Sequence, residues 1–446
     1  MIKEPPAEVR NDLDGATRDE VADYQARKLR TTTSWIAERS DYWRERFAAE
    51  SFDPATVEGP EDLHRAPTLW KREYFRSLEE DREGYGGFLC HPMDEILANG
   101  AIVFRTTGTS GMQGRFVNTH EGFQLFGDEY ARVVWEAGAR PGDFVLVAFP
   151  LSSWAAGWGL LYACQRLGCT FIAGGAPLDT AARLGLLQEY RPTIAVMTPS
   201  YAVTLGSAAA EHGLQLGDLR LNGLILTGES YSPGRRDRIE DLWGVEGKSR
   251  NAYGISEGGP LCSGFECSQQ DGIHLNEDVA VHQFWKPDSD EPVGEGEVGE
   301  YVFTHLDQRV MATWFNFRTR DAAIFSDEPC ACGRTSRRMW VKDRLDDMVK
   351  VKGVNIFATT VEGILKPIVG LGDEYKLIVE TVNDRDQVTV QVESEPGMSS
   401  EQPAEELRQS LKSQIGVTLK VDVVEPGTLP RTELKARRWD DRRPKD

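Results

Sequence analysis

The sequence lacks any long apolar run. No stretch of its 446 residues approaches the roughly 18 to 20 consecutive apolar residues that a membrane-spanning helix requires. The first residues, MIKEPPAEVRNDLDG, also lack the apolar centre of a signal peptide. From these two absences we expect a cytoplasmic protein that does not bind membranes.

Positive charge is scarce as well. The chain has 51 Lys and Arg residues against 71 Asp and Glu residues, which gives a formal net charge of -20. An excess of acidic groups disfavours general affinity for nucleic acid and for anionic membranes. We therefore expect a small-molecule substrate and no nucleic-acid partner, and any anionic ligand must be bound by a local site.

Cysteine is infrequent and forms no regular framework. Seven Cys residues in a chain of this length do not suggest the disulfide scaffold of a small secreted protein. Free thiols or metal ligands are the expected roles. Internal repeats and low-complexity tracts are also absent. The length predicts two or three globular domains, or one large domain with a smaller attachment.

Apolar strand-like runs alternate with helical patterns through the middle of the chain. The strand-like runs are DFVLVAFP, CTFIAGG, TIAVMTPS, LNGLILTGE and SRNAYGI, and the helical segments between them include AAGWGLLYACQRLG, TAARLGLLQEYR, YAVTLGSAAAEHG and PGRRDRIEDLWG. This alternation predicts βαβ units in a mainly parallel sheet covered by helices. Ligands collect at the carboxyl ends of the strands in such sheets.

The pattern changes after Asp278 to short strands and turns, as in EPVGEGEVGEYVFTHL. From about Met348 it predicts a compact α+β segment in which EYKLIVETV and DQVTVQVES pair as strands and residues 403–414 form a helix. The predicted fold class is α/β. We expect residues 1–345 to form a large N-terminal domain of mainly parallel, helix-covered sheets plus a β-rich subdomain, and residues 346–446 to form a small α+β domain.

A glycine-rich loop interrupts the run IVFRTTGTSGMQGRF. A mononucleotide P-loop needs a second glycine five residues after the first and then a lysine, but the residue five after Gly108 is Gln113. What remains is a turn of hydroxylated residues and glycines, Thr106 to Gly111, whose N–H groups can wrap a polyphosphate. An ordinary solvated hairpin turn is the alternative.

Six segments, the glycine-rich loop among them, occur in an order that identifies a family. TTGTSG, TGES at Thr227, NAYGISEGGP at Asn251, FRTRD at Phe317, DRLDDMVKVKGVNIF at Asp343 and LPRTELKARR at Leu429 resemble, in order and spacing, the motifs of the adenylate-forming superfamily. The chain is most similar to phenylacetate-coenzyme A ligases, which TPSYA, GIHLNED and PCACGRTSRR also resemble. The resemblance extends from about Tyr42 to Arg438.

This resemblance implies ATP-dependent activation of a carboxylic acid as an acyl-adenylate, with release of pyrophosphate, followed by transfer to coenzyme A. It implies that Glu257 holds Mg²⁺ and that Lys435 bridges carboxylate and phosphate oxygens during adenylation. It also implies a set of nucleotide-binding residues: Thr106, Thr107, Gly108, Thr109, Ser110, Gly111, Gly228, Glu229, Ser230, Tyr253, Gly254, Ser256, Asp321 and Arg344. The alternatives are a surface carboxylate at Glu257, a surface pair of Asp321 and Arg344, and a solvated lysine in a basic tail.

The chain departs from the family pattern at two places. Met112 and Gln113 replace the Lys-Pro pair that commonly closes the phosphate loop, so the compensating charge must come from elsewhere, such as Arg105 or Arg115. Leu434 replaces the glycine that usually precedes the terminal lysine. The family also rotates its small domain about a residue that matches Asp346, which is the predicted hinge, so the resemblance implies that residues 346–446 are mobile.

Four residues have the composition of a closed zinc site. Cys267, His274, Cys330 and Cys332 offer three thiols and one imidazole, which suit tetrahedral structural zinc. Some phenylacetate ligases carry similar sets, although the spacing differs from common zinc knuckles. Buried reduced thiols are the alternative.

The identity of the acid is the least determined property. Trp154, Trp158 and Tyr201 are candidates for the walls of a pocket for an aromatic acid, and core packing is their alternative role. Three hypotheses stay open: a ligase that forms a coenzyme A thioester, an adenylating enzyme with another acceptor (a carrier-protein thiol, an amine or nitrite), and a non-catalytic nucleotide-binding protein. A homodimer is also left open.

Overall fold

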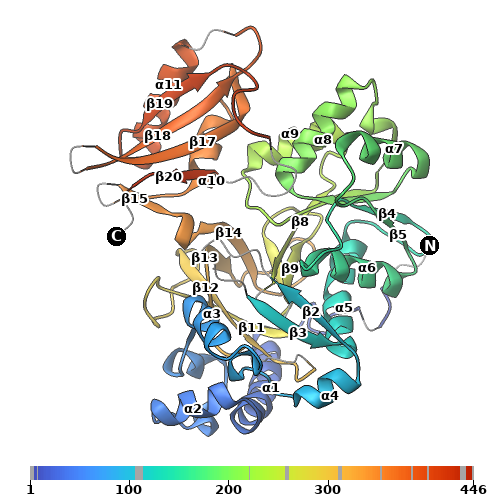
Figure 1. Ribbon diagram of the computed structural model, residues 1–446, viewed down its shortest axis with the longest axis vertical. Coiled ribbons are helices and arrows are strands. Elements are labelled where there is room, and N and C mark those ends of the chain that lie inside the picture. Colours follow the sequence, from blue (N-terminus) through green and yellow to red (C-terminus); the bar gives the residue numbers. More distant parts are fainter. Residues whose placement is uncertain are drawn as a thin grey trace. The chain divides into compact units, whose positions relative to one another are not determined.

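The computed structural model (Figure 1) describes residues 5–7, 9–105, 114–219, 221–256, 261–309, 314–351, 354–382, 385–398, 401–431 and 438–443. The chain forms two compact units. The first comprises Met1–Met197, Leu219–Thr227 and Gly247–Trp340, and the second comprises Thr198–Asp218, Gly228–Glu246 and Val341–Asp446. Within the described residues, no helix combines the length and apolar character needed to cross a bilayer.

One part of the large sheet in the first unit is parallel. Its strands run in the order β5 (Thr170–Ala173), β4 (Phe144–Val147), β6 (Ile194–Met197), β7 (Gly223–Thr227) and β8 (Ser249–Ile255). The helices of this region are α5 (His120–Glu136), α6 (Ala155–Leu167) and α7 (Thr180–Tyr190). Strands β6 and β7 are buried along their whole length, as expected for parallel strands covered on both faces.

The same sheet continues beyond β8 with mostly antiparallel strands. These are β9 (Leu261–Glu266), β10 (Ile273–Leu275), β14 (Arg338–Arg344), β13 (Phe317–Ser326), β12 (Gly299–His305) and β11 (Ala280–Trp285), and β1 (Leu69–Trp70) pairs with β13. The predicted α/β class with a β-rich part is therefore confirmed, and the two parts share one twelve-stranded sheet.

The N-terminal region is mainly helical. It contains α1 (Arg18–Arg39), α2 (Asp41–Ala49), α3 (Lys71–Glu80), α4 (Met93–Ala98), the short helices η1 (Pro54–Thr56), η2 (Pro60–Arg65) and η3 (Tyr85–Gly87), and the hairpin of β2 (Ala101–Arg105) and β3 (Arg115–Thr119). Helix α1 begins with a capping box, in which Thr17 and Glu20 hydrogen-bond to each other's backbone N–H groups.

The second unit contains a smaller sheet of order β19-β18-β17-β20. Its elements are α8 (Pro199–Glu211), η4 (Leu216–Leu219), α9 (Pro233–Trp243), η5 (Leu345–Asp347), β15 (Val349–Val351), β16 (Val354–Ile356), α10 (Ala358–Leu365), β17 (Leu371–Val382), β18 (Arg385–Ser394), α11 (Glu401–Ile415), β19 (Lys420–Val424) and β20 (Trp439–Asp441).

Helices α10 and α11 supply apolar residues to the core of this second sheet. Leu377 of β17, Val390 of β18 and Leu407 of α11 are fully buried in one cluster. The predicted pairing of EYKLIVETV with DQVTVQVES is confirmed as the antiparallel pair β17 and β18, and the helix predicted at 403–414 is α11. The predicted domain division at residues 345 and 346 stays a prediction.

Candidate active site and metal centre

Two residues from the predicted nucleotide-binding set meet in the first unit. Tyr253 lies on β8 and Asp321 lies on β13. The Tyr253 hydroxyl donates a hydrogen bond of 2.5 Å to Asp321 Oδ2, and both side chains are partly exposed. The arrangement places a carboxylate, which can accept two hydroxyl groups, next to the edge of an aromatic ring.

The end of β7 is tied to the middle of β8. Thr227, the last residue of β7, donates a hydrogen bond of 2.6 Å from its Oγ1 to the carbonyl oxygen of Ala252, its neighbour in the parallel pair. Gly254 on β8 has no room for a side chain, because a Cβ atom there would lie 3.0 Å from the carbonyl oxygen of Leu261. The half-buried Ser256 follows β8 directly.

The segment after β7 turns sharply. Gly228 has a φ of +90°, a conformation that residues with a side chain rarely adopt. Glu229 Oε2 accepts a hydrogen bond of 3.1 Å from the backbone N–H of Ser200 in the first turn of α8, where a negative charge is favoured by the helix dipole. Ser230 is exposed.

Three parts of the predicted site lie outside the described residues. These are the phosphate loop with its departures (Thr106 to Gln113), Glu257, and Lys435 with Leu434. The two arginines proposed to compensate the loop are described. Arg105 is exposed, whereas the Arg115 guanidinium donates 2.8 Å to the carbonyl oxygen of Leu78.

Arg344 and the predicted hinge residue Asp346 contact each other. Arg344 Nη2 lies 2.9 Å from Asp346 Oδ2, and both side chains are a third or more exposed. An exposed ion pair of this kind contributes about 0–1 kcal/mol to stability. The pair therefore does not lock the segment that contains it.

The candidate pocket aromatics have different surroundings. Trp154 precedes α6, packs against the core of the first unit, and its ring lies 4.9 Å from that of Phe149. Trp158 Nε1 donates 2.8 Å to the carbonyl oxygen of Ser152. Tyr201 on α8 is almost fully buried. Their role in binding an acid stays a prediction.

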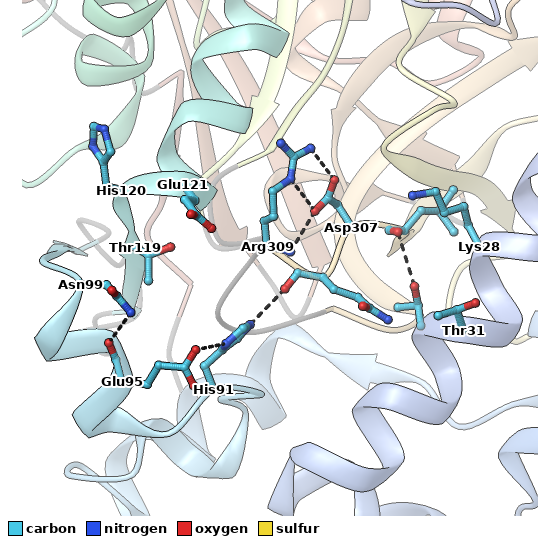
Figure 2. Close-up of a pocket in the computed structure, with 13 residues that line it drawn as sticks. Lys28, Thr31, His91, Glu95, Asn99, Thr119, His120, Glu121, Asp307 and Arg309 are labelled. Atoms are coloured by element: carbon cyan, nitrogen blue, oxygen red, sulfur yellow. Dashed lines mark hydrogen bonds and ion pairs between the residues drawn. The ribbon is translucent and has the colours of Figure 1, made fainter. Parts of the chain in front are cut away.

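A polar hollow of about 850 Å³ in the first unit was not predicted (Figure 2). The hollow is lined by residues of α1, of α4 and its flanks, of the start of α5 and of the segment after β12. Among the residues that the structure describes, none of this lining belongs to the predicted site. Arg309 donates two hydrogen bonds to the Asp307 carboxylate, and His91 Nδ1 lies 3.6 Å from Glu95. The Arg309 guanidinium in the hollow is thus paired with a neighbouring acid.

The four predicted metal ligands converge. Cys267 directly follows β9, His274 is on β10, and Cys330 and Cys332 lie between β13 and β14. The ligand atoms of the four residues all lie within 4.8 Å of one another. Strands β9, β10 and β14 are consecutive in the sheet, which explains why residues far apart in the sequence meet there.

The distances in this cluster suit a tetrahedral zinc ion. Cys267 Sγ lies 3.7 Å from Cys330 Sγ, and Cys332 Sγ lies 3.6 Å from His274 Nε2. Zn–S bonds of about 2.3 Å and Zn–N bonds of about 2.05 Å separate two sulfur atoms by about 3.8 Å, and sulfur from nitrogen by about 3.6 Å. The sulfur atoms are too far apart for a disulfide, which has an S–S distance of about 2.05 Å.

A second layer of residues orients these ligands. Ser336 Oγ lies 2.9 Å from His274 Nδ1, so a proton on Nδ1 leaves the lone pair of Nε2 facing the thiols, as in known metal sites. The backbone N–H of Gln269 donates 3.4 Å to Cys267 Sγ. Burial raises the pKa of the Cys267 thiol to about 12 and lowers that of His274 to about 4. Ser336 was not predicted, because a serine carries no metal-ligand signal.

The cysteine loop also holds the N-terminal segment. Arg334 Nε donates 2.8 Å to Asp14, and its Nη2 donates 3.0 Å to Glu136 of α5. Thr335 Oγ1 donates 2.5 Å to the carbonyl oxygen of Ala16. The cluster of Cys and His side chains is therefore coupled to the segment before α1 and to the end of α5.

Two family models match the chain. The model described as AMP-binding enzyme matches residues 54–305, and the model described as AMP-binding enzyme C-terminal domain matches residues 353–443. The chain is 31% identical to the phenylacetate-coenzyme A ligase of Thermus thermophilus over 95% of this chain and 96% of that protein. It is 30% identical to the phenylacetate-coenzyme A ligase of Aromatoleum evansii over the full length of both.

A solved structure shares both the fold and part of the sequence. The 2-hydroxyisobutyryl-CoA ligase in complex with 2-HIB-AMP superposes with a TM-score of 0.90 at 26% identity, over 98% of this chain and 94% of that chain. Family model, sequence relatives and structure agree. The protein therefore belongs to the AMP-binding, adenylate-forming enzymes, in the family of the phenylacetate-coenzyme A ligases.

Proposed function

We propose that the protein is an AMP-forming acid–thiol ligase. It activates a small aromatic carboxylic acid as an acyl-adenylate, releases pyrophosphate, and transfers the acyl group to coenzyme A. The observation that carries this proposal is the hydrogen bond between Tyr253 and Asp321, which unites two residues of the nucleotide-binding set in a chain whose relatives are coenzyme A ligases.

The described residues suit recognition of the nucleoside. The ionised carboxylate of Asp321 can accept hydrogen bonds from both ribose hydroxyls, and the ring of Tyr253 offers a face on which adenine can stack. Gly228, Glu229, Ser230, Gly254, Ser256 and Arg344 complete the proposed nucleotide contacts. The reaction needs charge stabilisation rather than a protein nucleophile, and this set contains no nucleophilic thiol or imidazole.

The proposed charge-stabilising groups follow from the sequence. Thr106–Gly111 would bind the β- and γ-phosphates, and Lys435 would place a flexible point charge between the carboxylate and phosphate oxygens. One carboxylate, Glu257, is chemically adequate for Mg²⁺, since this ion keeps most of its water ligands. Magnesium would neutralise phosphate charge when it is bound.

An aromatic acid is proposed because the curated relatives are named for phenylacetate. Trp154, Trp158 and Tyr201 are the proposed pocket residues. We also propose that residues 346–446 rotate about Asp346 between the two half-reactions, and that the enzyme works in the cytoplasm, where ATP and coenzyme A are available.

Structural zinc is the proposed occupant of the cysteine cluster. Three thiols and one imidazole form a closed ligand set with no position left for a substrate, and the observed distances fit this ion. The site would connect β9 and β10 with the loop before β14 and would take no part in the chemistry.

The test is pyrophosphate release from purified protein with ATP, Mg²⁺ and a panel of acids. Release that depends on an arylacetic or benzoic acid supports adenylation, and a mass spectrum of the acyl-coenzyme A product identifies the acceptor. Pyrophosphate release without a thioester would assign a different acceptor. No release with any acid would leave only nucleotide binding.

A further inference from the structure

Strand β13 is irregular at the residue proposed to bind ribose. Arg318 pairs with Val302 of β12 and Ala322 pairs with Glu300, so Thr319, Arg320 and Asp321 together lie opposite Tyr301 alone. Arg320 has a φ of +65°, which a residue with a side chain adopts only when its surroundings impose it. Bulges of this type redirect side chains and are frequent beside active sites.

A fully buried carboxylate holds the bulge from within the sheet. Glu300 Oε1 accepts a hydrogen bond of 3.1 Å from the backbone N–H of Arg320. Glu300 Oε2 accepts bonds of 3.0 and 2.7 Å from Nε and Nη2 of Arg318. The Glu300 carboxylate thus connects Arg320, which has the positive φ, with Arg318, which precedes the bulge.

Arg318 is equally buried and uses all of its guanidinium donors. Besides Glu300, its acceptors are the carbonyl oxygens of Ser289 and Lys286 and the carboxylate of Asp290, at 2.8, 3.1 and 2.9 Å. Its guanidinium carbon lies 4.1 Å from the ring centre of Trp70. Burial raises the pKa of Glu300, and the Arg318 guanidinium opposes this rise.

The threonine between them completes the support. Thr319 Oγ1 donates 2.8 Å to the carbonyl oxygen of Tyr301 and accepts 3.1 Å from the backbone N–H of Asp321. The backbone is therefore held on both sides of Arg320. Asp321 follows directly after these supported residues, and its carboxylate accepts a hydrogen bond from the Tyr253 hydroxyl.

We propose that Glu300 and Arg318 are positioning residues for nucleotide recognition: through the bulge of β13 they orient the Asp321 carboxylate for the ribose hydroxyls. The proposal rests on the proposed role of Asp321. If the bulge were not held in place, the enzyme would discriminate less well between ATP and nucleotides that lack a ribose hydroxyl. Its affinity for the acid would not change.

The test variant is Glu300→Gln, measured in the acid-dependent pyrophosphate assay. Glutamine has one amide oxygen and one NH2 group, so it replaces only one of the two carboxylate oxygens, and either Arg318 or Arg320 then faces an N–H donor instead of an acceptor. We expect the KM for ATP to rise about tenfold and the preference for ATP over 2′-deoxy-ATP to fall by a similar factor, since a hydrogen bond to a charged group has this order of effect. The KM for the acid should not change.

Asp290→Asn is the matched control. This variant removes the negative charge of Asp290, a half-exposed partner of Arg318 on the side away from the bulge. It should leave the preference for ATP over 2′-deoxy-ATP unchanged. Asp321→Asn is measured in parallel. If Asp321→Asn reduces the preference and Glu300→Gln does not, the positioning role is overturned and the proposed function stands. If Asp321→Asn has no effect, its ribose role is wrong and the inference falls with it.

Thr319→Val provides a second variant if Glu300→Gln does not fold. Valine has the same shape but cannot link Tyr301 to Asp321. We expect the same loss of preference for ATP, and a full wild-type preference in Thr319→Val would overturn the proposal. Thermal unfolding of each variant separates this effect from loss of stability, because reduced stability alone does not alter discrimination between two nucleotides.

Discussion

At the residue scale, Tyr253 and Asp321 are proposed to make two different kinds of interaction with ATP. The Tyr253 ring offers a face on which adenine can stack. The Tyr253 hydroxyl orients the Asp321 carboxylate through a hydrogen bond of 2.5 Å. Stacking of a base on an aromatic side chain is worth about 1–3 kcal/mol. A single hydrogen bond to a charged group is of similar size, so only graded substitutions distinguish them.

We predict that Tyr253→Ala weakens ATP binding by at least about tenfold, which corresponds to about 1.4 kcal/mol. Tyr253→Phe keeps the ring and should lose less. Equilibrium titration with ATP, with the KM for the acid as the control, measures both. Equal losses in the two variants would show that the hydroxyl, rather than the ring, dominates.

Lys435 belongs to the same scale, although it lies outside the described residues. Lys435→Ala should slow adenylate formation by about 10²-fold or more, because a preorganised positive charge is removed from the phosphoryl-transfer transition state. ATP binding should change little. Pyrophosphate release in the single-turnover regime measures this step.

The second half-reaction provides the control for Lys435. Supplied with chemically synthesised acyl-adenylate, Lys435→Ala should still transfer the acyl group to coenzyme A at the parent rate. Adenylate formation at the parent rate would instead place Lys435 in solvent, as the departure at Leu434 allows.

At the scale of elements, the cysteine cluster joins strands that are distant in sequence. Cys267 follows β9, His274 lies on β10, and the loop with Cys330 and Cys332 precedes β14. Arg334 and Thr335 of the same loop hold Asp14 and Ala16. Removal of the proposed zinc should therefore affect this group of elements before it affects the proposed nucleotide site.

We predict about one zinc ion per chain in protein purified without chelator, since a closed set of four such ligands is typical of structural zinc. Cys332→Ser should lower thermal stability more than it lowers ATP affinity. Elemental analysis and calorimetry check the two statements, with Cys164→Ser as a control for loss of a buried thiol elsewhere. If the purified protein contained no zinc, the proposal that zinc occupies the cysteine cluster would be contradicted.

The proposed hinge is a second feature at this scale. Asp346 lies in the short helix η5 and is exposed. Asp346→Pro should slow thioester formation and leave adenylation nearly intact, because proline restricts the φ change that a hinge must absorb. The two half-reactions are measured separately, and Asp346→Ala serves as the control. An equal loss in both steps would argue against this pivot.

At the scale of the whole molecule, buried histidines make stability depend on pH. Burial lowers the pKa of His282 to about 4 and that of His305 to about 3, below the value of about 6.5 expected in an unfolded chain. His282 is held between Tyr301 and the carbonyl oxygen of Asn276. Because the unfolded state binds these protons first, the stability contribution is present above about pH 6.5 and is lost as the pH falls towards 4.

We predict that the free energy of unfolding declines between about pH 6.5 and pH 4, with up to about 3 kcal/mol from His282. His282→Gln should be less stable at pH 7 but should show a flatter decline. Urea unfolding at several pH values measures both slopes. Parallel slopes in the variant and the parent would show that His282 does not carry the dependence.

The elements themselves could be predicted because their signals are local. SRNAYGI has the same bounds as β8, and PGRRDRIEDLWG is α9 with its closing glycine, directly after the capping residue Ser232. Apolar periodicity and capping residues act within a few positions. The ordered motifs likewise identified the family, since they depend only on residue type and spacing.

The sequence by itself determined the alternation of strands and helices in the middle of the chain, the strand pair and helix near its C-terminus, the family and the candidate ligands, because these depend on residue type and on spacing along the chain. Only the tertiary structure decided that the parallel and antiparallel strands form one sheet, that Cys267 meets Cys330, and that Ser336 orients His274. It also decided the bulge at Arg320 and its support by Glu300. These contacts depend on strand order and register between distant segments, and a two-residue insertion in one strand leaves no local pattern that would reveal its partner.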